Sequence, residues 1–164
     1  MSSGPLHGRL RVDHQDGILL VSMEADQALL VEGTRHPRWL PFTIEHTDNY
    51  SDLRHFGESL APNALAGFNT KMTESLMRTS PGGNRIGAVL VDRRRVDAWA
   101  GFDGTSFVSD QMEQYNTAIL APVVHRKLRH LMELPAWRGA DVPHPFQADL
   151  LEALLIECLS PESS

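Results

Sequence analysis

Eight histidines are the first residues in this chain that could carry chemistry. Metal ligands on a helix converge at spacings of three or four residues. His125 and His130 are five residues apart, so on a helix they would point about 140° away from each other. His7 and His14 flank a predicted strand and have no acidic or thiol partner at a ligand spacing. We therefore predict no metal site and interpret the histidines as surface residues.

Nucleophilic residues form no catalytic motif either. Cys158 is the single cysteine, which excludes an internal disulfide, and it lies among Leu154, Leu155 and Leu159. Apolar surroundings raise a thiol pKa, so we expect this cysteine to pack as a small apolar side chain. No serine stands in a Gly-x-Ser-x-Gly turn. The sequence therefore predicts a protein that is not an enzyme, with no catalytic residue and no cofactor.

Two further motifs could contact an anion. The loop 81–85, Pro-Gly-Gly-Asn-Arg, could cradle a phosphate, but it runs from a predicted helix to a strand and lacks the lysine of a phosphate loop. We interpret it as a helix stop. Arg93-Arg94-Arg95 could bind an acid or a phosphate, or could be the solvated tip of a hairpin. Asp92 and Asp97 partly cancel its charge, which favours the solvated tip.

Size and charge limit the possible classes of protein. With 164 residues, 41% of them hydrophobic, the chain fits a single domain 1–164 with one core. We divide it into a disordered N-terminus (1–6), an α+β core (7–134) and a C-terminal amphipathic helix (145–159). A formal charge of -6 disfavours general binding to nucleic acid or to anionic lipid. Since no segment reads as a signal peptide or a membrane span, we expect a cytoplasmic protein without nucleic-acid or membrane partners.

The N-terminal part reads as a β-meander. Apolar runs around Leu10 and Val12, at 18–23 and at 28–32 are separated by turns rich in Asp, Gly and Glu. A fourth strand is predicted at 39–44. Prolines lack a backbone N–H, so Pro37 and Pro41 place that strand at an edge or make it irregular.

After residue 50 the pattern becomes helical. Leu65, Phe68, Met72 and Leu76 recur at spacings of three, four and four, which predicts a helix over 65–77. A shorter helical turn is expected at 52–60. The remaining expected elements are a hairpin of 86–91 with 96–102, a helix over 110–132 kinked at Pro122, and the terminal helix 145–159. The fold class is α+β, an antiparallel meander plus hairpin that forms a twisted sheet packed by two or three helices.

This order of elements resembles the CesT/SycE-type secretion chaperones of bacterial type III systems. The helix 65–77, the segment 82–87, the hairpin within 89–102 and the helix 110–132 carry the resemblance, and 16–20 is similar to the family's early strand. The family's first amphipathic helix has no counterpart before the meander. The terminal helix 145–159 would have to take its place, and it could equally dock on its own domain or on a neighbour.

The resemblance implies a non-enzymatic chaperone or adaptor that binds a secreted effector polypeptide, keeps it soluble and export-competent, and forms a homodimer. Apolar sheet and helix surfaces would hold the client. The predicted partner-binding residues are Leu19, Val21, Leu29, Val31, Leu150 and Leu154. The predicted dimer interface consists of Leu65, Phe68, Met72, Val89 and Trp99.

Two alternatives remain open. One is a small α+β enzyme whose site is assembled from scattered polar residues such as Asp48, His55, Asn69 and Arg85. The other is a structural or regulatory protein-interaction domain. A concave pocket with converging titratable groups would favour the enzyme, whereas exposed apolar patches and a two-fold dimer would favour the chaperone.

Overall fold

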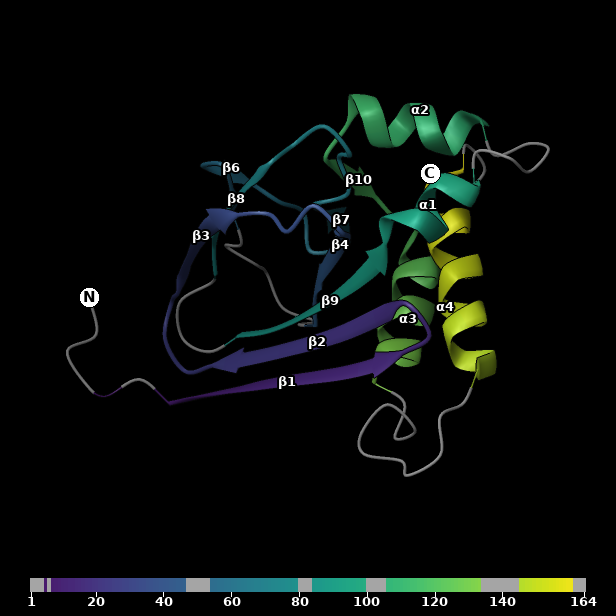
Figure 1. Cartoon of the computed structure of the whole chain (residues 1–164). Coiled ribbons are helices and arrows are strands. Elements are labelled where there is room, and N and C mark those ends of the chain that lie inside the picture. Colours follow the sequence, from purple (N-terminus) through teal and green to yellow (C-terminus); the bar gives the residue numbers. More distant parts are fainter. Residues whose placement is uncertain are drawn as a thin grey trace.

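The computed structural model describes residues 5, 7–46, 54–79, 84–99, 106–133 and 145–160. These residues form an α+β fold with two antiparallel sheets and a group of helices at one end of the larger sheet (Figure 1). In pairing order, the larger sheet consists of β1 (Gly8–Gln15), β2 (Ile18–Ala25), β9 (Asn84–Asp92), β4 (Trp39–Glu45), β7 (Ala64–Ala66) and β10 (Thr117–Ile119). The smaller sheet consists of β3 (Leu30–Thr34), β8 (Glu74–Arg78), β5 (Arg54–His55) and β6 (Glu58–Ser59).

The hairpin of β1 and β2 follows directly from the sequence. Asp16 (φ 45°) and Gly17 (φ 78°) form its two-residue turn, and both adopt the left-handed conformation that such turns require. From this turn the two strands pair in register over their full length, with Gln15 opposite Ile18 and Gly8 opposite Ala25. The three predicted strands are confirmed as β1, β2 and β3, but only β1 and β2 pair as in a meander, because β3 pairs with β8 in the smaller sheet.

One face of the larger sheet is packed against the helices α1 (Arg93–Trp99), α2 (Ser106–Gln114), α3 (Pro122–Met132) and α4 (Pro145–Cys158). The helices α3 and α4 pack against each other beside this sheet (Figure 1). The core joins Ile18 and Leu20 of β2 with Leu40, Phe42, Ile44, Val89, Val91, Leu128, Leu151 and Leu155. Phe42 is in ring contact with Phe68 and Trp99, at centroid distances of 6.2 and 6.0 Å.

The predicted helix over 65–77 is wrong, because β7 and β8 occupy this stretch. The chain turns after β7 at Gly67, whose φ of +97° does not suit an α-helix. The side-chain amide of Asn69 then donates to the carbonyls of Glu113 and Tyr115, at 3.3 and 3.2 Å, and fixes the loop. The apolar periodicity combined Leu65 of β7 and Leu76 of β8 with Phe68 and Met72 of the loop between them. The predicted helical turn at 52–60 is also wrong where the structure describes it, since β5 and β6 lie there.

The predicted return strand 96–102 is replaced by α1 over its described part, 96–99. The Asp92 carboxylate accepts a hydrogen bond from the backbone N–H of Arg94 at 3.0 Å, which makes Asp92 the N-cap of this helix. The strand predicted at 86–91 is confirmed as part of β9. Residues 100–102 lie outside the described part of the chain.

The single kinked helix predicted over 110–132 is α2, β10 and α3 instead. Pro122 begins α3, a position where its missing N–H costs nothing, rather than kinking a longer helix. β4 is not an edge strand, because it lies between β9 and β7. β7 pairs with β4 only at Thr43 among the described residues, which leaves Pro41 outside that ladder. The terminal helix is confirmed as α4, and its buried face docks on its own domain.

Candidate functional site

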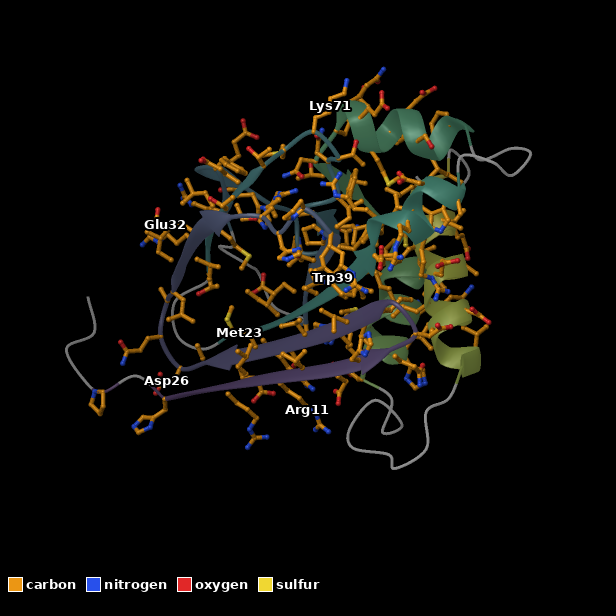
Figure 2. The ribbon with its side chains drawn as sticks, in the orientation of Figure 1. Arg11, Met23, Asp26, Glu32, Trp39 and Lys71 are labelled. Atoms are coloured by element: carbon orange, nitrogen blue, oxygen red, sulfur yellow. The ribbon has the colours of Figure 1, made fainter. Side chains whose placement is uncertain are left out.

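A small pocket lies on the helix-side face of the larger sheet, where strand ends meet the end of α3. Its volume is about 50 Å³. Two cross-strand rows form its floor: Arg9, Glu24 and Arg85 in one, and Arg11, Ser22 and Gly87 in the other. The residues that alternate with them along each strand, such as Leu10 and Met23, face the other side of the sheet. Figure 2 shows Arg11 and Met23 pointing to opposite sides of the β1–β2 hairpin.

The wall of the pocket is a polar pair formed by a buried histidine and a half-buried glutamate. His46, directly after β4, has a side chain that is only 4% exposed, and its Nδ1 lies 2.7 Å from Oε1 of Glu133 at the end of α3. Burial lowers the pKa of His46 below its usual value, and the neighbouring carboxylate does not fully offset this effect. The imidazole is therefore neutral at pH 7, and its Nδ1–H donates to Glu133.

Glu133 remains a carboxylate in this arrangement. Its partial burial opposes ionisation, but the hydrogen bond from His46 and the charges of Arg85 and Arg129 outweigh burial and lower its pKa. Arg85 reaches both acids of the site, with Nη1 3.5 Å from Glu133 and Nε 3.2 Å from Glu24. The end of α3 is thus linked to β4 and β9 through charged and polar side chains.

Gly87 allows this wall to close on the sheet. A Cβ at this position would overlap Nε2 of His46 and would lie 2.5 Å from Cε of Met132. Nε2 itself is buried and has no hydrogen-bond partner in the part of the chain that the structure describes. Buried polar atoms are nearly always paired, so this open acceptor marks the pocket as a polar site.

The pocket opens into a wider, shallow hollow of about 420 Å³ at the end of the β1–β2 ladder. Arg9, Glu24 and Arg85 line both spaces, and His7 and Asp26 extend the hollow. Taken together, the two spaces offer guanidinium groups, a neutral imidazole, a serine hydroxyl and the carboxylates of Asp13, Glu24, Asp26 and Glu133. Such groups bind polar or anionic ligands. Within the described ranges, no three histidine, cysteine or acidic side chains gather closely enough to hold a metal ion.

The predicted partner-binding residues do not form one surface. Leu19 and Val21 lie half-buried on the face of the larger sheet opposite the helices, while Leu29 is half-buried and Val31 is exposed near the smaller sheet. Leu150 is exposed on α4, in the helix layer. Leu154, also on α4, is packed in the core. Leu19 and Val21 therefore lie on the opposite side of the larger sheet from Leu150 and Leu154, while Leu29 and Val31 lie outside that sheet.

The predicted dimer interface requires a correction. Leu65, Phe68 and Val89 have no exposed surface and Trp99 is 1% exposed, all within the core of a single chain. Their side chains fill the space between sheet and helices, so they are not available to a second copy. Met72 is half-buried in the loop between β7 and β8.

The scattered polar residues of the enzymatic alternative are not brought together. Arg85 lines the pocket, Asn69 fixes a loop to the end of α2, and His55 lies in the smaller sheet. Asp48 lies outside the described residues, as do 81–83 of the predicted phosphate loop.

The arginine triplet is not a solvated hairpin tip, because it forms the first turn of α1. Arg93 donates to the carbonyl of Thr70 at 2.9 Å, and Arg94 pairs with Asp92. Arg95 binds Glu152 of α4 at 2.6 Å. It also contacts Asp149 of α4 at 3.3 Å and donates to the carbonyl of Asp16 in the β1–β2 turn. The favoured interpretation as a solvated hairpin tip is therefore wrong, and the acids that these arginines contact lie within the chain.

Sequence reasoning missed most residues of the pocket. Arg9 and Arg11 alternate with apolar residues, the usual sign of a solvent-facing strand surface. His46 and Glu133 are 87 positions apart, and no local pattern connects them.

Comparisons with known proteins give one structural likeness. No family model and no curated protein matches the sequence. The fold is similar to the crystal structure of the AraC-like transcriptional activator CuxR, with a TM-score of 0.65 and 12% sequence identity. The similarity covers 93% of this chain and 55% of that protein, so the chain spans about half the length of its structural neighbour. No helix in the described ranges is both long and apolar enough to cross a membrane.

Proposed function

We propose that this chain is a non-enzymatic regulatory domain that senses a small ligand, comparable to a part of an AraC-like transcriptional regulator that does not contact DNA. The likeness of fold over almost the whole chain supports the regulatory class. The net charge of -6 opposes contact with a phosphate backbone, so DNA binding would fall to another part of such a regulator.

The observation that carries this proposal is the composition of the pocket wall. The strands β1, β2 and β9 supply its floor, while Met132 and Glu133 at the end of α3 supply its side. A ligand held there contacts sheet and helix layer at once. If the ligand makes better contacts with one position of α3 than with another, it favours that position. The helix α4 packs against α3 and would move with it.

The test is a thermal-shift screen of the purified chain against a broad library of small metabolites, charged and neutral. We expect at least one chemical class to raise Tm, because a ligand that binds only the folded state stabilises it. Ser22→Leu, which places a larger side chain in the pocket floor, should abolish the shift. Ser59→Leu on exposed β6 is the matched control and should retain it. A screen in which no compound stabilises the chain would refute the proposal.

One observation favours the adaptor function as a second candidate. β1 is an edge strand of the larger sheet, and its Leu10 and Val12 are 68% and 54% exposed. An open edge with apolar side chains can accept a strand from a partner polypeptide, such as an effector client or a second copy.

Light scattering and binding of labelled N-terminal segments of secreted proteins would test this candidate. Val12→Lys should weaken such binding and leave the metabolite-dependent shift intact. A monomer that binds none of the segments would eliminate the adaptor function.

A further inference from the structure

We infer that the pocket binds a small oxyanion, a carboxylate or phosphate group that also carries a hydroxyl, between Arg9, Arg11 and His46. This inference rests on the proposed ligand-sensing function and names the chemical class of the ligand. Three observations support it. The arginines of β1 have few partners, most of the nearby acids are already paired, and the buried imidazole of His46 has an acceptor nitrogen without a partner.

The arginines of β1 supply the available positive charge. Arg9 forms no ion pair within the described residues, and Arg11 contacts only Asp13, at 3.3 Å. As residues i and i+2 of one strand they face the same side, about 7 Å apart along the strand. Two guanidinium groups at that separation can hold the oxygens of one carboxylate or phosphate from both sides. Ser22, directly opposite Arg11, adds a hydroxyl donor.

The acids near the pocket are already paired and do not compete for these arginines, apart from Asp13. Glu24 is held by Arg85, and Glu133 is held by His46 and Arg85. Arg129 adds a further positive charge close to His46 and Glu133. The lining of the pocket holds three arginines and three acids, so its formal charges balance, and the positive charge open to a ligand is local to Arg9 and Arg11.

His46 sets the requirement for a hydroxyl. Its Nδ1–H is used by Glu133, so Nε2 of the neutral ring is an acceptor without a partner in the described chain. Because this atom is buried, a ligand hydroxyl reaches it only when the wall of the pocket shifts. A ligand that offers only acceptor oxygens would leave Nε2 unpaired. Hydrogen phosphate and 2-hydroxycarboxylates each provide an oxyanion together with an O–H donor. The pocket of about 50 Å³ suits such a group, and the adjoining hollow can take the rest of a larger ligand.

Calorimetry and thermal shift on the full chain at low ionic strength test the inference with four probes: inorganic phosphate, lactate, acetate and neutral lactamide. We expect phosphate or lactate to bind, and acetate to bind more weakly because it lacks the hydroxyl. Stronger binding of phosphate than of lactate, or the reverse, identifies which oxyanion the site prefers. Lactamide should produce no shift.

Arg9→Gln should weaken binding about tenfold or more, as expected for the loss of a charged hydrogen bond. Arg9→Gln with Arg11→Gln should abolish it. Both residues lie at the surface of an edge strand, so the variants should fold. Arg126→Gln, an exposed arginine of α3 that does not line the pocket, is the control. His46→Phe should reduce the preference for lactate over acetate.

Binding of lactamide or other neutral compounds without binding of either oxyanion would overturn this inference and leave the proposed function standing. An equal loss in Arg126→Gln would also overturn it, because the effect would then be general charge attraction. Failure of every compound in the wider screen would refute the proposed function as well.

Discussion

Nδ1 of His46 lies 2.7 Å from Oε1 of Glu133, and this contact ties the end of β4 to the end of α3 across 87 positions of sequence. Arg85 and Gly87 of β9 complete the arrangement, one by charge and the other by its lack of a side chain. The pair therefore joins the proposed ligand pocket to the packing of β4, β9 and α3.

Acid should destabilise the protein before its carboxylates titrate. Burial lowers the pKa of His46, and burial with the nearby Arg35 lowers that of His55 to about 4. The unfolded chain then binds protons more readily than the folded chain, so stability is complete above pH 6.5 and falls as the pH drops towards 4. Below about pH 4.5, protonation of Glu133 removes further stability, because its pKa is lower in the folded protein than in the unfolded chain.

Urea unfolding at pH 7.5, 5.5 and 4.5 measures how the free energy of unfolding depends on pH. For His55 alone the shift corresponds to a loss on the order of 3 kcal/mol at the acid end. His55→Gln should flatten the pH dependence between 6.5 and 4. A free energy of unfolding that stays constant over this range would contradict the assignment.

Gly87→Ala should destabilise the fold by about 1–3 kcal/mol, because the added methyl group overlaps His46 and Met132. Chemical denaturation gives the value. In a Met132→Ala background the same change should cost less, since the nearby Cε atom has been removed. An equal cost in both backgrounds would show that the space at Gly87 does not depend on Met132.

Arg95→Ala should cost about 1–2 kcal/mol, because this side chain joins the β1–β2 turn to α4 through three partners. Arg94→Ala is the matched control: its side chain is 82% exposed and, among the residues that the structure describes, pairs only with Asp92, so we expect a smaller loss. The difference should shrink in high salt, which screens exposed charges. Equal losses for the two variants would argue against the bridging role of Arg95.

Cys158 should react slowly in the native protein. Burial, reinforced by the charge of Glu157, raises its thiol pKa to about 12. Iodoacetamide at pH 8 should therefore label it only after denaturation, when the thiolate becomes accessible. Mass spectrometry of native and urea-treated samples distinguishes the two cases. Rapid labelling of the native protein would show that α4 detaches readily.

The parts of the fold that the sequence predicted correctly are those set by local chemistry. Asp16 and Gly17 predicted the first turn, and the apolar residues around Leu155 predicted α4. The helix expected over 65–77 failed because long-range pairing decided the structure: β7 lies between β4 and β10. The start of α1 had a local signal in the capping residue Asp92, which the hairpin interpretation overlooked.

The pocket was not predictable in the same way. Arg9 and Arg11 form a polar strand face whether or not a site exists, and only the register with β2 and β9 adds Glu24, Ser22 and Arg85 to it. The wall depends on where α3 ends relative to β4, which is a property of the packed core. Sequence patterns indicate secondary structure, whereas this site forms only when segments far apart in the sequence pack together.

The position of β1 at the edge of the larger sheet has a dynamic consequence. Its only ladder is with β2 among the described residues, so it can separate from the sheet without disturbing β9 or β4. Amide hydrogen exchange in β1 should therefore report local opening at a lower free energy than exchange in the central strands. A ligand bound by Arg9 and Arg11 would fasten this strand, and protection of its amides would rise before any change in the core.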